Sequence, residues 1–213
     1  MRKAKFANGE FYHIYNRGND KRQVFFDRGD TERFLQGMIE FNTRQPIGSL
    51  FENSFRDNSK LSSRTAKLVD IVCFCLNANH YHFIIRQRIE NGISEFMKRL
   101  GGGYVQYFNF KHKRSGVLFQ GKFKAAHINS NKYLLHLSAY VNLNNYVHRI
   151  QDDKFRSSWQ EYLGNDDKNL CTKNIILDQF NNKNEYKNFA ESSLKSIKER
   201  KDLLKDLESM LFD

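Results

Sequence analysis

Residues 70–86 read DIVCFCLNANHYHFIIR, and this stretch decides the fold. Two apolar runs flank the polar turn Asn77-Ala78-Asn79, which is the pattern of a β-hairpin whose strands are buried in a sheet. Side chains alternate between the two faces of a strand, so His80 and His82 should point the same way and Tyr81 to the opposite face. Two imidazoles placed in this way can share one divalent metal ion.

On both sides of this hairpin the hydrophobic periodicity changes between strand and helix, which excludes an all-helical bundle. Residues 10–17 predict a strand, and Asp30 or Thr31 is a candidate N-cap for a helix that runs to about Phe41. A polar segment follows that contains the only proline of the chain. We therefore expect an exposed insertion or loop near 45–67.

After the hairpin, apolar residues at helical spacing predict a helix over residues 92–110. The triplet Gly101-Gly102-Gly103 lies within it and predicts a weak point or a bend. Residues 117–128 then have the pattern of a strand or hairpin. A good cap at Asn129-Ser130-Asn131 precedes a second helix, expected over residues 133–147.

The remaining sequence predicts the domain organisation. Two polar helices, over 173–180 and 186–210, suggest a C-terminal helical extension at 166–213 that follows one domain at 1–165. No apolar run approaches the roughly 18 residues of a membrane span, and the N-terminus is too polar for a secretory signal, so we expect a cytoplasmic protein. The three cysteines are an odd number and favour reduced core thiols over disulfides.

Charge is distributed unevenly along the chain. Residues 1–95 carry 15 basic and 11 acidic side chains, residues 96–151 carry 9 and 0, and residues 152–213 carry 11 and 13, which together give the net charge of +11. Tyrosine and phenylalanine lie among the basic residues of the middle block. Phosphates attract cations and bases stack on aromatic rings, so this block suits a single-stranded nucleic acid. A solvated basic face over an aromatic core would have the same composition, and the charge pattern alone does not choose between the two.

Three stretches of the chain, in order, resemble the single-tyrosine HUH transposases, and among these the REP-associated tyrosine transposases most closely: residues 73–85, 115–124 and 140–144. The likeness begins near residues 12–19 and continues weakly to about residue 189. It implies an α+β fold, in which helices pack on the antiparallel sheet of a ferredoxin-like or RRM-like HUH core and further helices follow at the C-terminus.

The resemblance also implies a metal-dependent endonuclease and strand transferase that cuts and rejoins single-stranded or hairpin DNA. Tyr140 is then the nucleophile that forms a covalent phosphotyrosine bond, and His80 and His82 are metal ligands. Asn144 matches the position of a third ligand, and it lies four residues after Tyr140, hence on the same helical face. Mg²⁺ or Mn²⁺ would neutralise the phosphodiester and favour ionisation of a phenol whose ordinary pKa is about 10.

Alternatives remain at this stage. The expected DNA contacts are Arg17, Asn19, Lys111, Lys113, Arg114, Lys122 and Lys124, but Lys122 and Lys124 are explained equally well as charges that protect a strand edge. Ala78 and Asn145 stand where relatives usually carry proline, which puts the local backbone rigidity in doubt. The alternative to the enzyme is a domesticated, non-catalytic protein that binds single-stranded nucleic acid. Whether the protein acts as a monomer or a homodimer is left open.

Overall fold

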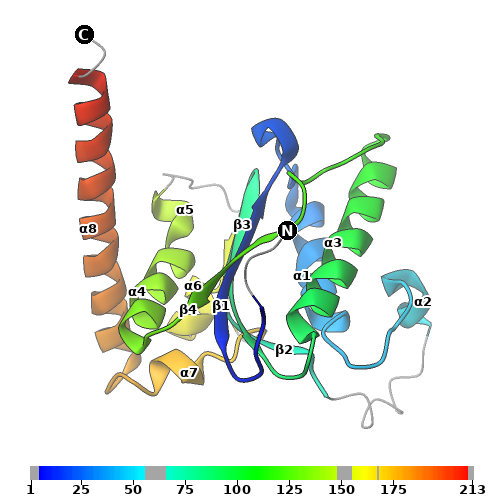
Figure 1. The fold of residues 1–213 in the computed structure, drawn as a ribbon, viewed down its shortest axis with the longest axis horizontal. Coiled ribbons are helices and arrows are strands. Elements are labelled where there is room, and N and C mark those ends of the chain that lie inside the picture. Colours follow the sequence, from blue (N-terminus) through cyan, green and yellow to red (C-terminus); the bar gives the residue numbers. More distant parts are fainter. Residues whose placement is uncertain (1–4, 56–65, 148–154, 167, 211–213) are drawn as a thin grey trace.

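A five-stranded antiparallel sheet lies at the centre of the computed structural model, which describes residues 5–55, 66–147, 155–166 and 168–210 (Figure 1). The strand order is β4-β1-β3-β2-β5. The strands are β1 (Phe11–Arg17), β2 (Val69–Asn77), β3 (His80–Gln87), β4 (Lys124–Ile128) and β5 (Arg156–Ser157). The sequence prediction of an α+β fold with the histidines at the start of a central strand is confirmed.

Helices cover both faces of the sheet (Figure 1). One face carries α1 (Arg28–Glu40) and α3 (Gly92–Lys111), and the other carries α4 (Asn131–Asn142) and the C-terminal helices. The remaining helices are η1 (Asn19–Lys21), α2 (Leu50–Ser54), α5 (Asn144–Val147), α6 (Trp159–Leu163), α7 (Asn174–Leu177) and α8 (Lys183–Met210). No helix in the described part of the chain is both long enough and apolar enough to cross a membrane.

The alternation of β3 separates the core from the polar face. Tyr81 and Phe83 pack against Phe34 of α1, with ring centroids 5.5 and 6.2 Å away. His80 and His82 point to the other face, where α4 lies, and both are half-buried. The predicted sidedness of this strand is therefore correct.

The first helix begins earlier than predicted. Its N-cap is Asp27, whose side chain accepts a hydrogen bond from the backbone N–H of Asp30. Asp30 is fully buried in the first turn and accepts from the N–H of Phe26. The expectation that Asp30 or Thr31 caps this helix was wrong. The helix begins at Arg28, about one turn before the start that the apolar pattern indicated.

The glycine triplet does not interrupt α3, which is continuous from Gly92 to Lys111. A Cβ atom on Gly103 would lie 2.9 Å from two ring atoms of Phe41, so this glycine allows α3 to pack closely on that ring. At Gly101 and Gly102 a Cβ atom would meet nothing within 4 Å. The triplet does not interrupt the helix, and the weak point or bend expected there stays a prediction. The packing that explains Gly103 does not explain Gly101 and Gly102.

Two further segments differ from or extend the prediction. The expected loop near 45–67 contains α2, which begins with a capping box formed by Ser49 and Glu52; residues 56–65 lie outside the described part of the chain. At the C-terminus, α8 packs on α4, where the buried hydroxyl of Tyr186 contacts the side chains of Ser138 and Asn142. The C-terminal extension therefore shares the core of the preceding residues.

Candidate functional site

The two histidines of β3 and the tyrosine of α4 lie together on one face of the sheet. The rings of His80 and His82 are 5.2 Å apart between centroids and nearly perpendicular. The ring of Tyr140 meets His82 edge to face at 5.7 Å. The structure thus brings together three side chains that are up to 60 residues apart in the sequence, as the resemblance implied.

Asn144 joins this group and lies just after a break in the predicted helix. The expected continuous helix over 133–147 is divided, because α4 ends at Asn142 and α5 starts at Asn144. The buried amide oxygen of Asn144 accepts a 2.6 Å hydrogen bond from Asn77 Nδ2 and lies 3.2 Å from His80 Nε2. Its Nδ2 atom is buried and has no hydrogen-bond partner among the residues that the structure describes.

The hydrogen bonds of His80 fix its tautomer. Its Nδ1 atom lies 2.7 Å from the side-chain oxygen of Asn79, which can only accept, so Nδ1 carries the proton. The lone pair is then on Nε2, which faces the amides of Asn77 and Asn144 at 2.9 and 3.2 Å. Burial lowers the pKa of His80, partly opposed by Asn144, and this favours the neutral ring.

His82 is held by a third histidine, His13 of β1. Strand β1 pairs with β3 so that Tyr15 lies opposite His82, and His13 Nε2 approaches His82 Nδ1 to 2.9 Å. Burial lowers the pKa of His13 to about 4, so this ring is neutral at pH 7. One of the two nitrogen atoms then donates the proton of the hydrogen bond that fixes the orientation of His82.

The phenol of Tyr140 is not poised to ionise by itself. Burial raises its pKa above the ordinary value of a tyrosine, and the Asn144 side chain opposes that shift only in part. At neutral pH the hydroxyl is therefore protonated. A nucleophilic role needs an additional cation or base close to the oxygen.

A cationic pocket of about 460 Å³ opens beside the histidines. Its lining is mostly polar and comprises Tyr15, Asn16, Arg17, Lys21, Asn79, His80, His82, Gln120 and Lys124. Arg17 is oriented by a 2.6 Å hydrogen bond from its Nε to Gln120. Tyr140 does not line this pocket and reaches the site from the α4 side of His82.

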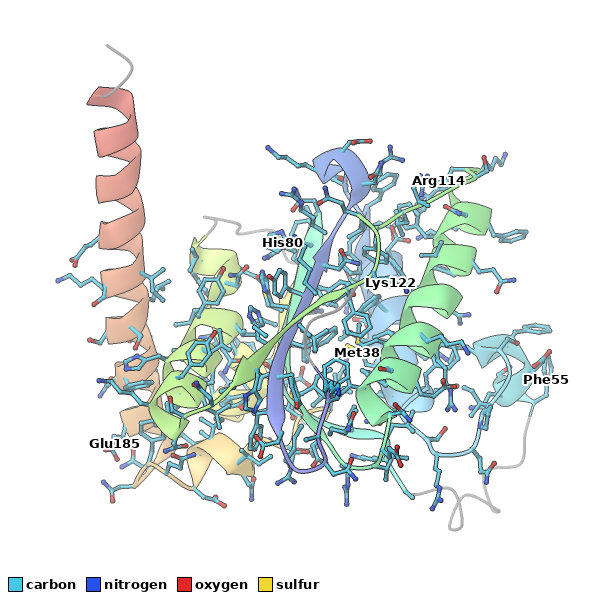
Figure 2. All side chains as sticks on the ribbon, in the orientation of Figure 1. Met38, Phe55, His80, Arg114, Lys122 and Glu185 are labelled. Carbon is cyan, nitrogen blue, oxygen red and sulfur yellow. The ribbon has the colours of Figure 1, made fainter. Side chains whose placement is uncertain are left out.

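Only some of the residues predicted to bind DNA line the pocket beside the histidines. Arg17 and Lys124 line the pocket, and Lys122 lines a neighbouring groove. Asn19 lies in η1, directly after the end of β1, and its side chain bonds to Asp20. Lys113 and Arg114 follow the C-terminal end of α3, where Figure 2 shows Arg114 well separated from His80.

Lys111 is bound by carboxylates of its own chain. Its ammonium group lies 2.7 Å from Asp27 and 2.9 Å from Asp30, and His112 contacts Asp30 at 3.0 Å. The carboxylate and imidazole atoms of Asp27, Asp30 and His112 lie within 4.8 Å of one another, a spacing that could hold a metal ion. The ammonium group of Lys111 offsets part of this negative charge and contacts both carboxylates, so a metal ion in the aspartate cluster would have to displace it.

The structure adds residues that the sequence did not assign to the site. His13, Asn77 and Asn79 hold the histidines or Asn144, and Lys21 lines the pocket. His13 lies on the same face of β1 as Arg17, so correct pairing of β1 with β3 would have identified it. In the sequence, Asn77 and Asn79 indicated only the turn of a hairpin.

The two positions where relatives usually carry proline are held by hydrogen bonds instead. The carbonyl of Ala78 accepts from the backbone N–H groups of Val24 and Phe25. The side-chain oxygen of Asn145 accepts from the thiol of Cys75 in β2, which ties α5 to the sheet. The local backbone is therefore anchored without a proline ring.

Comparison with known proteins identifies the family of the chain. The family described as "Transposase IS200 like" matches residues 9–144, well over half of the 213-residue chain. The chain therefore belongs to the IS200-like transposases, and the resemblance found in the sequence is confirmed. No curated protein matches the chain.

A solved structure shares the fold. The chain is similar to a REP-associated tyrosine transposase determined in complex with a REP hairpin, with 13% sequence identity and a TM-score of 0.50. The match covers 77% of this chain and 85% of the other. At this identity the likeness shows that the two proteins share the arrangement of sheet and helices. It does not assign a role to any residue of this chain.

Proposed function

We propose that this protein is a metal-dependent endonuclease and strand transferase that acts on single-stranded DNA through a covalent bond to Tyr140. The observation that carries the proposal is the convergence of His80, His82, Asn144 and Tyr140 on one sheet face beside a cationic pocket. Membership of a transposase family supports the same reaction class.

The donor set fits a divalent cation. With bonds of about 2.1 Å in octahedral geometry, adjacent ligand atoms of a small divalent ion lie roughly 3 Å apart, and His80 Nε2 and Asn144 Oδ1 are 3.2 Å apart. His80 presents a lone pair at that nitrogen, and the hydrogen bond to Asn79 is the outer contact that orients metal-binding histidines in general. One amide oxygen and two imidazoles suit Mn²⁺ and also accommodate Mg²⁺.

A bound cation would act as a Lewis acid that neutralises the phosphodiester and favours the phenolate. Tyr140 would then attack phosphorus: a phosphoester bond to the phenol oxygen forms while the bond to one sugar oxygen breaks. The phenol proton is released, and the departing sugar oxygen takes up a proton to become a hydroxyl. One phosphoester replaces another, so a new hydroxyl end can reverse the step and join strands without a nucleotide cofactor.

The walls of the pocket would hold the DNA backbone. Arg17, Lys21 and Lys124 surround the histidines and can bind phosphate oxygens. The solved relative is bound to a REP hairpin, and we infer that this chain also takes DNA with a hairpin beside a single-stranded segment. Lys111 is excluded from this set because Asp27 and Asp30 hold its ammonium group.

The test is a covalent adduct assay. Labelled single-stranded and hairpin DNA from the sequence flanking the gene is incubated with the protein and Mn²⁺, then resolved under denaturing conditions. The wild type should form an adduct that chelation prevents and that Tyr140→Phe lacks. Tyr146→Phe is the matched control, because Tyr146 is an exposed tyrosine of α5, and it should retain the adduct.

An adduct that persists in Tyr140→Phe would remove this tyrosine from the mechanism. If the wild type binds DNA but forms no adduct on any flanking sequence, the protein is the non-catalytic binder that the sequence left open.

A further inference from the structure

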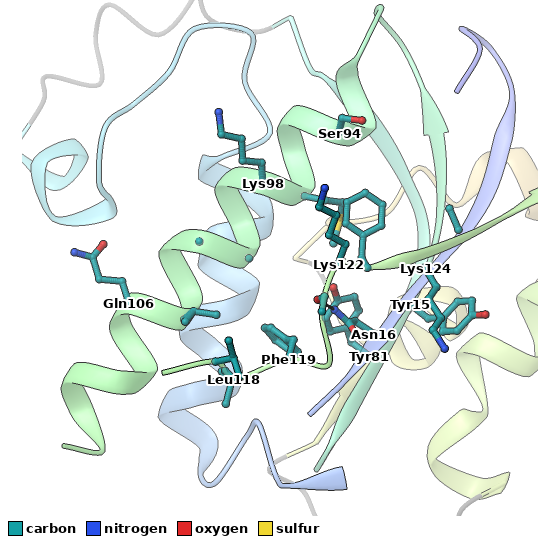
Figure 3. A pocket seen from close by; sticks show the side chains of 18 residues that line it. Tyr15, Asn16, Tyr81, Ser94, Lys98, Gln106, Leu118, Phe119, Lys122 and Lys124 are labelled. Atoms are coloured by element: carbon teal, nitrogen blue, oxygen red, sulfur yellow. Dashed lines mark hydrogen bonds between the residues drawn. The ribbon is translucent and has the colours of Figure 1, made fainter. Parts of the chain in front are cut away.

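A groove lies along α3, next to the histidine pocket. Its volume is about 1470 Å³, and it runs between α3 and the chain segment that leads into β4 (Figure 3). Val105 of α3 and Leu118, Phe119 and Phe123 of the facing segment supply apolar lining. Such a groove accepts flat apolar groups.

Two glycines keep the α3 side of the groove open. Gly101 and Gly102 line it, and a Cβ atom at either position would meet nothing within 4 Å among the residues that the structure describes. Glycine destabilises a helix interior relative to alanine, and α3 is continuous through these two positions. Packing explains Gly103 but not these two, so the bare helix surface has a use outside the fold.

The charge of the groove favours an anionic occupant. Among the described residues, the 18 that line it include Lys98, Lys122 and Lys124 and no acidic side chain (Figure 3). Cations beside an apolar, aromatic lining match a single DNA strand, because phosphates bind cations and bases stack on aromatic rings.

The groove is continuous with the candidate active site. Tyr15, Asn16 and Lys124 line both the groove and the histidine pocket. A strand whose phosphodiester lies at the histidines therefore has a direct path across these three residues into the groove.

We propose that the α3 groove binds the bases of the single-stranded DNA next to the phosphodiester that is cut, and that Gly101 and Gly102 leave room for these bases on the α3 side. This inference rests on the proposed function for the identity of the ligand. It assigns to the glycine pair the task of leaving room for nucleobases.

The experiment places a larger side chain in the groove. Gly102→Leu is made in the Tyr140→Phe protein, so that cleavage cannot affect the measurement, and binding is followed by fluorescence anisotropy. The probes are a labelled oligothymidine of about 20 nucleotides, longer than the site of about 4–16 nucleotides that one small nucleic-acid-binding domain covers, and a blunt hairpin without single-stranded ends. The variant should bind oligothymidine about 10-fold more weakly and the hairpin unchanged.

A matched control and a stability measurement separate this effect from damage to the fold. Ser192→Leu adds similar bulk at an exposed position of α8 and should leave both affinities unchanged. Because leucine favours helix over glycine, Gly102→Leu should raise the melting temperature while it weakens binding.

Equal affinity of parent and Gly102→Leu for oligothymidine would overturn the proposal, and so would an equal loss on both probes. Failure of the proposed function shows itself differently, as a missing adduct in the cleavage assay, because the groove is tested by binding alone.

Discussion

The two polar clusters on opposite sides of the sheet contain similar ligand atoms and differ in what balances them. In the aspartate cluster, the ammonium group of Lys111 contacts both Asp27 and Asp30 and offsets part of their negative charge. In the histidine cluster, formed by His13, His80, His82 and Asn144, the hydrogen bonds described above join imidazole rings and amide groups and involve no carboxylate or ammonium group.

The comparison teaches that ligand type alone does not identify a metal site. Two carboxylates and an imidazole within 4.8 Å look the stronger candidate by chemistry. The histidine cluster is the better one, because the lone pair of His80 Nε2 and the amide oxygen of Asn144 lie 3.2 Å apart and both meet the neutral Nδ2 group of Asn77, whereas the carboxylates of the aspartate cluster meet an ammonium group. Four substitutions can break or sharpen this contrast.

The largest effect is expected at a proposed ligand. His80→Ala removes one of three donors and should weaken Mn²⁺ binding by more than about 100-fold, beyond the 10–100-fold usual for outer residues. Calorimetric titration measures it. His112→Ala is the control and should bind Mn²⁺ like the wild type, because Lys111 fills the aspartate cluster; a larger loss in this control would reverse the two assignments.

The second effect is on stability. Lys111→Met removes the ammonium partner of Asp30, whose side chain is fully buried, and should lower the free energy of unfolding by about 2 kcal/mol. Partial exposure of Lys111 keeps the loss below that of a fully buried pair. Urea denaturation measures it, and exposed Lys113→Met should change stability little. Equal stability of the two variants would contradict the structural role of Lys111.

The third effect is indirect and concerns His13. His13→Ala removes the hydrogen-bond partner of His82 Nδ1 and should weaken Mn²⁺ binding about 10-fold, within the range of outer residues. His13→Gln keeps a hydrogen-bonding group and should restore part of the affinity, whereas a residue needed only for packing would show no such rescue. Titration of both variants with Mn²⁺ decides the matter.

The smallest effect is a pH dependence at Asp27. The hydrogen bond from Lys111 lowers the pKa of Asp27 in the folded protein. Its contribution is therefore present above the unfolded pKa of about 4 and is lost as pH falls through the lower folded value. The side chain is half exposed, so the contribution should be only about 0.5 kcal/mol.

Asp27→Asn tests this prediction, because asparagine caps a helix as well as aspartate does. Unfolding in urea should show a lower stability than the wild type at pH 7 and a smaller difference at pH 3. A difference that grows in acid would contradict the sign of the shift.

Much of the fold could be predicted because its signals are local. The hairpin turn, the alternation along β3 and the Ser130 cap of α4 each depend on a few neighbouring residues. The errors arose where packing overrode local preference: α3 stays helical through three glycines, and α1 starts at Arg28, after the Asp27 cap, with Asp30 of its first turn buried against Lys111 and His112.

The site was predictable only in part for the same reason. The histidine pair follows from strand geometry, and Tyr140 with Asn144 follows from the spacing of a helix. The contacts of His13 and Asn77 depend on strand pairing and on the position of α5, which no short stretch encodes.

By itself, the sequence determined that His80 and His82 share a face, because the period of a strand is a property of the local backbone. It also predicted one helix through Tyr140 and Asn144, which the structure divides into α4 and α5. Only the tertiary structure decided that these two pairs meet, that His13 holds His82, and that Lys111 serves the fold. Those facts depend on which strands pair and where helices dock, and burial of the whole core fixes both.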